Sequence, residues 1–488
     1  ETYLRLYPTG ADSDRVRQRL AALMATAGRP PTQVDTLAAK GRDRRDREKG
    51  DWRAGGSLST YYMRDETHQR ISDDASNTTT ELNDTNLNQV LTAGDMFATY
   101  VGDKVRVKFR ASGTYTNDFR PRGHDIGALS ALNVEIADSR QRYMARLGRQ
   151  TRSTGGVLGR FDGGLASIRL NDMFKLEFVA GSPVLTPKKV MVDKDRVFYG
   201  TSLAFGRFRN AWDGDIYVIE QRSHGEIDRR AVGAELRYLR NGRSVFSAVD
   251  YDIHFNTLNF AIVNGSWTYG DGGALTFSMD YRRSPLLFTD NALIGQPVFG
   301  IDQLRVIYSD GEIRQLAMDR SAEAKTVTLG IAQPLSKKLS FNTDLTVSQV
   351  SATPESGGVP ASPATGTEYY LSAQLIGSGL FREGDIGILG LRYADTNNMS
   401  AWLVDLNTRY PWSRTFRINP RLQVGYRQNK NNSGTELSAR PSLRLYYMTR
   451  HKLQFEPEVG GEWLQSNTPT GHETTTGYYV NMGLRRDF

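Results

Sequence analysis

The chain has 488 residues, a formal net charge of +8 and 39% hydrophobic side chains, which is enough apolar material for a large folded unit. It contains no cysteine, so disulfides, thiolate metal sites and cysteine nucleophiles are excluded. No apolar run approaches the ~20 residues that a membrane helix needs, whereas the strands of a transmembrane barrel hide their hydrophobicity in alternation. The chain starts at Glu1 rather than at a methionine, which suggests a processed product.

The first 50 residues differ from the rest of the chain in pattern and charge. Val16, Leu20 and Leu23 share one helical face, Ser13 can cap the start of that helix, and two prolines at positions 30 and 31 end it. The dense charge run over residues 40–50 has the composition of a solvated linker. We therefore expect a helical segment over residues 1–30 and a charged linker over residues 31–50.

After residue 51 the hydrophobic period changes from 3.6 to 2 and stays there. Within residues 105–112, for example, Val105, Val107 and Phe109 alternate with basic residues. Such alternation is typical of strands that have one apolar and one wet face. The strands are mostly 9–13 residues long, which suits a tilted crossing of a bilayer at ~9–11 residues. The sequence predicts an all-β fold, a large antiparallel transmembrane barrel over residues 51–488.

The strand number follows from length. Residues 51–488 number 438 (488 − 50), and about 22–25 residues for each strand with its connection gives roughly 18–20 strands, with 16 or 22 as alternatives. Polar stretches at 64–90, 116–128, 351–367, 428–435 and 465–476 are expected to be the longer loops of one side, and Asn241-Gly242 is expected to be a tight turn.

Residues 286–320 interrupt the strand rhythm and predict a helical loop insertion. Ser309 and Glu312 have the spacing of a capping box, and a short apolar helical stripe follows them. A long insertion with its own structure is often a lid or a constriction, so it is a candidate plug or gate of the barrel, with an ordered surface loop as the alternative. The gate candidates are Asp302, Ser309, Glu312 and Arg314.

The polar faces of the predicted strands are the candidate lumen. Basic side chains there would attract anions, while acidic ones form other sectors, so the lumen is mixed rather than uniformly anion-selective. The alternative is that these basic and acidic side chains pair with one another and form a rigid charged wall. The lumen-lining candidates are Arg106, Lys108, Arg110, Asp250, Asp252, Asp280, Arg282, Asp344, Arg417, Arg421, Arg427, Arg440, Arg444, Glu456, Glu458 and Glu462.

Enzymatic interpretations find little support. The six histidines are scattered, and no HExxH, GxSxG or GxxxxGK[ST] motif is present. Asp250, Asp252 and His254 share a face at strand spacing, but a row of charges in a lumen explains them better than a hydrolase cluster. No catalytic residue, metal site or cofactor is expected, and no nucleic-acid partner, because the basic residues follow strand faces without a binding motif.

Two segments resemble known families. The C-terminal stretch puts Tyr478, Val480, Met482 and Leu484 on one face and finishes on Phe488, which resembles the insertion signal of bacterial outer-membrane barrels. Arg486 departs from that pattern, since an apolar residue is usual there. Residues 3–24, YLRLYPTGADSDRVRQRLAALM, resemble the end of a tetratricopeptide-type helical repeat array.

The combination resembles the outer-membrane exporters of bacterial exopolysaccharides, in which a periplasmic repeat scaffold precedes a barrel. The resemblance implies an outer-membrane location with the N-terminal segment in the periplasm, a secreted polymer as cargo, and periplasmic or inner-membrane secretion components as partners besides the membrane lipid. A barrel that secretes, anchors or assembles a surface protein or filament is the alternative. A simple diffusion porin is a third hypothesis, and the helical N-terminal arm argues against it.

Overall fold

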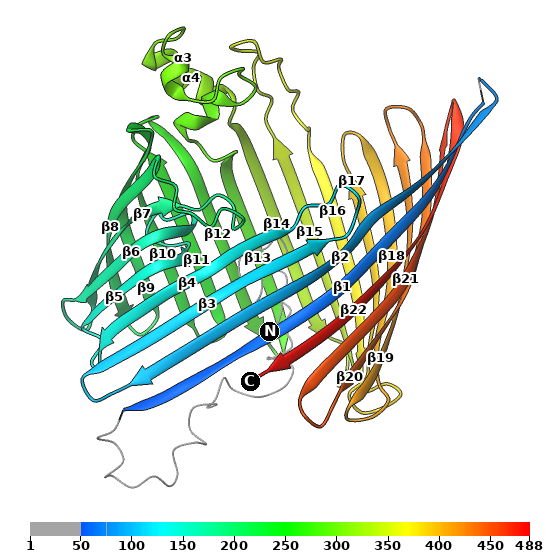
Figure 1. Cartoon of the computed structure of the whole chain (residues 1–488), viewed down its shortest axis with the longest axis horizontal. Coiled ribbons are helices and arrows are strands. Elements are labelled where there is room, and N and C mark those ends of the chain that lie inside the picture. Colours follow the sequence, from blue (N-terminus) through cyan, green and yellow to red (C-terminus); the bar gives the residue numbers. More distant parts are fainter. Residues whose placement is uncertain (1–49, 75) are drawn as a thin grey trace.

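A computed structural model describes residues 50–74 and 76–488 of the chain. The predicted helical segment at residues 1–30, and the linker at 31–50 apart from Gly50, lie outside the described residues. The described chain forms one closed antiparallel β-barrel with a small helical lobe above one rim (Figure 1). The predicted fold class is confirmed.

Each strand pairs with the next in antiparallel orientation, and the last strand pairs with the first. This closure leaves no free sheet edge, which is what a β-structure inside a membrane requires. The strands are β1 (Asp51–Asp73), β2 (Thr78–Val101), β3 (Val105–Asp118), β4 (Ile126–Asp138), β5 (Tyr143–Arg152), β6 (Gly159–Arg169), β7 (Phe174–Pro183), β8 (Arg196–Phe208), β9 (Trp212–Ser223), β10 (Glu226–Arg240), β11 (Arg243–Asp252), β12 (Thr257–Tyr269), β13 (Gly273–Ser284), β14 (Ala322–Pro334), β15 (Leu339–Val350), β16 (Glu368–Ser378), β17 (Ile386–Asp395), β18 (Met399–Pro411), β19 (Phe416–Asn429), β20 (Thr435–Met448), β21 (Leu453–Thr468) and β22 (Gly471–Asp487).

The barrel has 22 strands rather than the 18–20 that length predicted. The reason is the tightness of the connections at the lower rim, such as Asn241-Gly242, where both residues have positive φ values of 50° and 71° as a two-residue hairpin turn requires. Dividing 438 residues by 22 strands gives about 20 residues for each strand and connection, below the assumed 22–25.

Two of the predicted long loops are wrong. Residues 64–90 belong mostly to β1 and β2, and residues 465–476 mostly to β21 and β22, which a short turn at 469–470 connects. These hairpins form the upper right edge of the barrel in Figure 1. Their sequences are rich in Thr and Asn and lack the apolar alternation, because a strand with water on both faces needs no apolar face.

The outer wall of the barrel is apolar. Large side chains such as Leu147, Ile216, Met279, Leu329 and Leu389 are exposed on it at alternate positions of their strands. In the described part of the chain, no helix has the length and apolar character of a membrane span. Exposed large apolar side chains occur on nearly every strand of the outer wall, and a surface of this kind suits contact with lipid.

The helical lobe is the connection between β13 and β14, as expected for residues 286–320. It contains η2 (Thr289–Leu293), α3 (Ile301–Leu304) and α4 (Asp310–Asp319) around an apolar core that includes Leu287, Leu304 and Ile313. The predicted capping box is confirmed, since the Ser309 side chain and the Glu312 side chain bond reciprocally to each other's backbone N–H groups at the start of α4.

Candidate functional site: the lumen of the barrel

The inner face of the barrel is built by the residues that alternate with the exposed apolar ones. On β3 and β4, and on β5 up to Leu147, the large outward side chains are apolar, while Lys108, Glu135 and Arg146 point inward. The Lys108 Nζ atom donates to one oxygen of Glu135 at 2.8 Å, and the Arg146 Nε atom donates to the other oxygen at 3.0 Å. The inner wall is therefore lined by cross-strand charge pairs.

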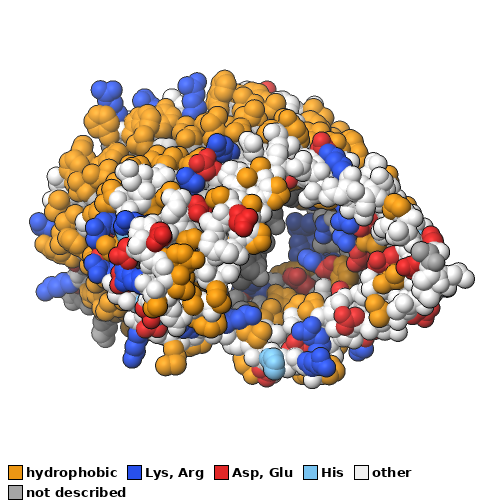
Figure 2. Space-filling view, turned by 90° about the horizontal axis from the view of Figure 1, so that it is seen from above, with side chains coloured by type: hydrophobic (Ala, Val, Ile, Leu, Met, Phe, Trp, Pro, Cys, Tyr) orange, Lys and Arg blue, Asp and Glu red, His pale blue; other side chains and the backbone are white. Residues whose placement is uncertain are grey.

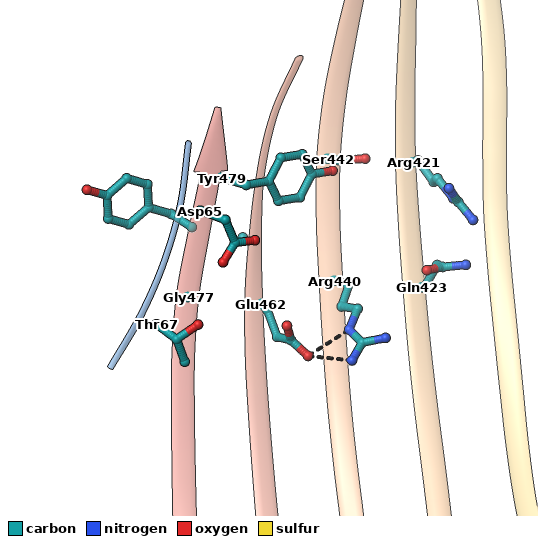
Figure 3. A pocket seen from close by; sticks show the side chains of 11 residues that line it. Asp65, Thr67, Arg421, Gln423, Arg440, Ser442, Glu462, Gly477 and Tyr479 are labelled. Atoms are coloured by element: carbon teal, nitrogen blue, oxygen red, sulfur yellow. Dashed lines mark hydrogen bonds and ion pairs between the residues drawn. The ribbon is translucent and has the colours of Figure 1, made fainter. Parts of the chain in front are cut away.

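A concave part of this wall is formed by β1 and β19–β22 (Figure 3). Arg440 and Glu462 are paired across β20 and β21, with an Nε to Oε1 distance of 2.8 Å. Tyr479 donates from its hydroxyl to Glu458 at 2.9 Å and lies beside Ser442. Such a surface offers carboxylate, guanidinium, hydroxyl and aromatic groups to a passing polar molecule. Its other lining residues are Asp65, Thr67, Arg421, Gln423, Gly461, Gly477 and Tyr478.

The lower part of β19 contributes cations that no described carboxylate neutralises. Arg427 near the upper end of β19 pairs with Glu436, whereas Arg417 and Arg421 form no ion pair with any described residue. The Arg417 guanidinium instead stacks over the Tyr446 ring at 3.7 Å from its centroid. The inner wall here carries a local excess of positive charge.

The opposite side of the lumen, at β5–β12, is packed rather than open. Arg229 and Asp250 form an ion pair in which both side chains are almost fully buried. The Tyr217 hydroxyl donates to Asp250 at 2.7 Å, and Arg229 donates to the carbonyl of Gly156 at 3.0 Å. Charges withdrawn from water in this way need such compensation, and they do not line a water-filled path.

An apolar cluster fills the space beside this network. Phe161, Phe198 and Ile219 are inward-facing and buried, and Val157 from the connection of β5 to β6 packs into the cluster. The same connection is held by Gly155, whose N–H donates to Glu235 Oε1 at 2.9 Å. The loop at 153–158 therefore folds into the barrel and occupies this side of it.

The hollow that remains is off-centre. Seen from above, one side of the molecule is covered, and beside it an opening is lined by Lys, Arg, Asp and Glu side chains (Figure 2). Strands β5–β9 lie on the covered side, and the β1–β2 and β21–β22 hairpins lie on the other (Figure 1).

The predicted lumen candidates separate into three groups. Paired inward residues are Lys108 with Glu135, Arg110 with Asp95, Asp280 with Arg282, Arg427 with Glu436, Arg440 with Glu462 and Arg444 with Glu458. A second group forms no ion pair with a described residue: Arg106, Arg417, Arg421 and Glu456. Asp344 has an interaction partner. Asp250 and Asp252 are wholly buried, so their prediction as members of a water-exposed lining needs correction: loop and wall residues cover them.

The gate candidates lie in the helical lobe, at the rim. Ser309 and Glu312 bond to one another as the cap of α4, and Asp302 is an exposed residue of α3. Arg314 lines a pocket of mixed polar and apolar character with His254 and Glu226. The lobe is attached to the rim through Asp290, which accepts from Ser223 at 3.0 Å and from Arg196 at 2.6 Å. Phe488 at the C-terminus forms two backbone hydrogen bonds with Gly56 of β1.

Glu135, Arg146, Tyr217 and Arg229 were missed in the sequence. For Tyr217 a signal was present, because residues 216–219, Ile-Tyr-Val-Ile, are apolar on both faces of β9, which is typical of a strand buried on both sides. Among residues 50–74 and 76–488, no group of three or more His, Cys, Asp or Glu side chains is arranged to hold a metal ion.

No protein-family model and no curated protein matches the chain. Solved structures similar to it include OccK2 (OpdF) of Pseudomonas aeruginosa, with 10% identity and a TM-score of 0.37 over 88% of this chain and 98% of that one. OccAB3 of Acinetobacter baumannii has 10% identity and a TM-score of 0.37 over 89% and 99%. A BenF-like porin from Pseudomonas fluorescens Pf-5 has 10% identity and a TM-score of 0.38 over 89% and 99%. At these values, none of them assigns a substrate or a binding residue to this chain.

Proposed function

We propose that this protein is a channel of the bacterial outer membrane that passes polar or charged molecules through the open side of its lumen. The observation that carries the proposal is the contrast between an apolar outer wall and an inward face of charged side chains around an off-centre hollow (Figure 2). A closed barrel with these two faces matches lipid outside and water inside. No covalent chemistry is proposed.

The unpaired Arg417 and Arg421 set the expected preference of the channel. Positive side chains in a narrow wet passage raise the local concentration of anions. The paired charges elsewhere on the wall contribute little net field because they neutralise each other. We therefore propose that anionic or hydroxyl-rich solutes pass more readily than cations.

Export of an exopolysaccharide is the narrower form of this proposal. It depends on the helical segment at residues 3–24, which lies outside the described residues, and in the barrel on Tyr446, Tyr479 and the charged wall as weak contact points for a sugar chain. A barrel for protein secretion or anchoring remains the alternative. An open hollow does not favour it, because such a barrel is expected to be filled or closed.

Single-channel conductance of the purified protein in a planar bilayer tests the proposal. The intact barrel should conduct steadily, and the reversal potential in a salt gradient should indicate anion preference. The double variant Arg417→Gln, Arg421→Gln should move the reversal potential toward cations. Arg230→Gln is the matched control, because this arginine faces outward beside Glu220 and should leave selectivity unchanged.

Two further measurements separate the alternatives. Block of the current by anionic but not neutral oligosaccharides would support the polysaccharide hypothesis. An intact barrel that is silent and conducts only after deletion of residues 286–320 would show that the helical lobe is a plug. If both proteins are silent, the channel proposal fails and an anchoring or assembly role replaces it.

A further inference from the structure

The barrel wall has a weak seam between β4 and β5. Their ladder has only six paired positions, from Leu132 with Arg149 to Ala137 with Met144, the shortest between described neighbours. Above it, β4 continues up to Ile126 but pairs only with β3. The β4 edge that faces the seam therefore presents backbone groups with no strand partner, which a lipid environment does not tolerate.

Side chains and a loop satisfy that edge instead. The Leu129 carbonyl accepts from Arg149 Nη1 at 3.2 Å, and the Ser130 carbonyl accepts from Arg160 Nε at 2.9 Å. The Leu129 N–H donates to the carbonyl of Pro187 at 3.0 Å. Pro187 belongs to the connection of β7 to β8, residues 184–195, which we call the strap.

The strap lies on the outside of the barrel. Arg149, Asp162 and Ser182 occupy outward positions of β5, β6 and β7. Gln150 and Phe161, which adjoin the first two, face inward, and Val179, three residues before Ser182, faces inward as well. Despite this outward position, the Arg149 side chain is only 2% exposed. Arg149 Nη2 donates to the Val190 carbonyl at 3.0 Å, and Ser182 Oγ donates to the Asp193 carbonyl at 2.5 Å. The strap thus covers an outward ion pair between Arg149 and Asp162, whose Nε to Oδ1 distance is 2.7 Å.

The depth of this covered pair places the strap in the bilayer. β5, β6 and β7 have 10, 11 and 10 residues, which is no more than the ~9–11 that one crossing needs. Arg149 and Asp162 belong to those strands and lie below their upper ends. A charge that faces lipid at this level is destabilising, and the strap removes it from lipid.

The free surface of the strap is apolar with basic residues beside it. Leu185 is 72% exposed and Met191 80% exposed, and Val190 and Val192 are exposed with them. Lys188 and Lys194 are exposed in the same twelve residues, and Lys189 is paired with Asp193 at 2.8 Å. A lipid surface with anionic headgroups fits both features, since acyl chains accept the apolar group and phosphates attract the lysines.

We propose that the strap is a lipid-binding element that inserts Leu185, Val190, Met191 and Val192 among the acyl chains of the outer leaflet, with Lys188 and Lys194 at its anionic headgroups. The strap thereby closes the β4–β5 seam from outside. This inference rests on the membrane location in the proposed function, and it is independent of what passes through the lumen.

The absence of cysteine allows single-site labelling of the complete chain. A nitroxide is attached to Met191→Cys, and the barrel is reconstituted in vesicles of phosphatidylcholine with phosphatidylglycerol. Collision with oxygen, which dissolves in lipid, is compared with collision with a water-soluble nickel chelate. We expect an oxygen-to-nickel ratio several-fold higher at Met191 than at Val306→Cys, which is 86% exposed on the helical lobe. A ratio equal to that of Val306 would overturn the proposal.

Leu147→Cys is the matched wall control, since Leu147 is 67% exposed on the outer face of β5. A water-accessible label at Leu147 would contradict the membrane location itself. A lipid-accessible Leu147 with a water-accessible Met191 would contradict the strap proposal alone. The two failures are therefore distinguishable.

The lysines are tested with Lys188→Glu and Lys194→Glu together, on the Met191→Cys background. The label should become shallower in the anionic vesicles and stay unchanged in vesicles of phosphatidylcholine alone. An equal depth in both vesicle types would overturn the part of the proposal that assigns the lysines to anionic headgroups.

Discussion

The two sides of the lumen differ in how far their charged side chains are exposed to water. At β9–β12 the pair Arg229–Asp250 is withdrawn from water and supported by Tyr217 and Gly156. At β20–β21 the pair Arg440–Glu462 is half exposed, in the wall of the hollow. The arginine–carboxylate pair is structural where it is buried, at β9–β12, and is available to solutes where it is exposed, at β20–β21. Burial therefore decides the role of such a pair.

The largest expected loss of stability comes from a substitution on the packed side of the lumen. Arg229→Met leaves the Asp250 carboxylate buried without its cation, which should lower the free energy of unfolding by about 3–5 kcal/mol. The measurement is urea unfolding of the barrel in lipid vesicles, followed by tryptophan fluorescence. Arg440→Met, the same change in the open wall, should alter stability by no more than about 1 kcal/mol.

The double variant Arg229→Met, Asp250→Leu sharpens this comparison. Replacing both charges by apolar side chains removes the unpaired carboxylate, so most of the loss should be regained. If the double variant is as unstable as Arg229→Met, the ion pair is not the reason for the difference between the two sides.

An intermediate effect is expected in the helical lobe. Leu304→Ala removes a fully buried side chain from the lobe core and should cost about 2–5 kcal/mol of local stability. The barrel should remain folded, because the lobe contributes no strand to it. Proteolysis of the intact vesicle-bound protein should then cut within residues 286–320 while the barrel core stays resistant. Loss of the heat-resistant barrel form would contradict this separation.

A smaller effect is expected at the cap of α4. Ser309→Ala removes the side-chain acceptor for the Glu312 N–H and should destabilise the helix by about 1 kcal/mol. We expect proteolysis of Ser309→Ala to be slower than that of Leu304→Ala and faster than that of the unchanged protein. Gln315→Ala is the control on the same helix. It removes one exposed side-chain hydrogen bond to Asp319, which contributes no more than about 0.5 kcal/mol, and should change the rate less than Ser309→Ala does.

The smallest effect is a pH dependence of the same cap. The Ser309 N–H and hydroxyl both donate to the Glu312 carboxylate and hold its pKa below the ordinary value. A lowered pKa in the folded state means that this stabilisation is present above the ordinary pKa of ~4.3 and is lost as the pH falls through the folded value. Spin-label mobility at Val306→Cys should therefore rise below about pH 4. Glu312→Gln should show a flat profile in that range.

The alternation of Val105, Val107 and Phe109 with basic residues was sufficient to predict a barrel, because a strand between lipid and water must alternate. It could not predict the packed side. Phe161 and Phe198 belong to strands that alternate as well, and only the fold of the 153–158 loop into the barrel decides that their inner faces are dry. The ion-pair partners Arg229 and Asp250 lie on different strands. Whether they come into contact depends on the register between those strands, and the sequence pattern of one strand gives no information about that register.

The closure of the barrel by β1 and β22 has a consequence for biogenesis. These strands pair over 17 positions, from Ser57 with Asp487 to Asp73 with Gly471, although almost the whole described chain separates them. A contact between such distant segments forms slowly and only after both have been delivered to the membrane. Until then the edges of β1 and β22 stay open to pairing with other chains. Until β1 and β22 meet, shielding of both edges would protect the unclosed sheet from such pairing.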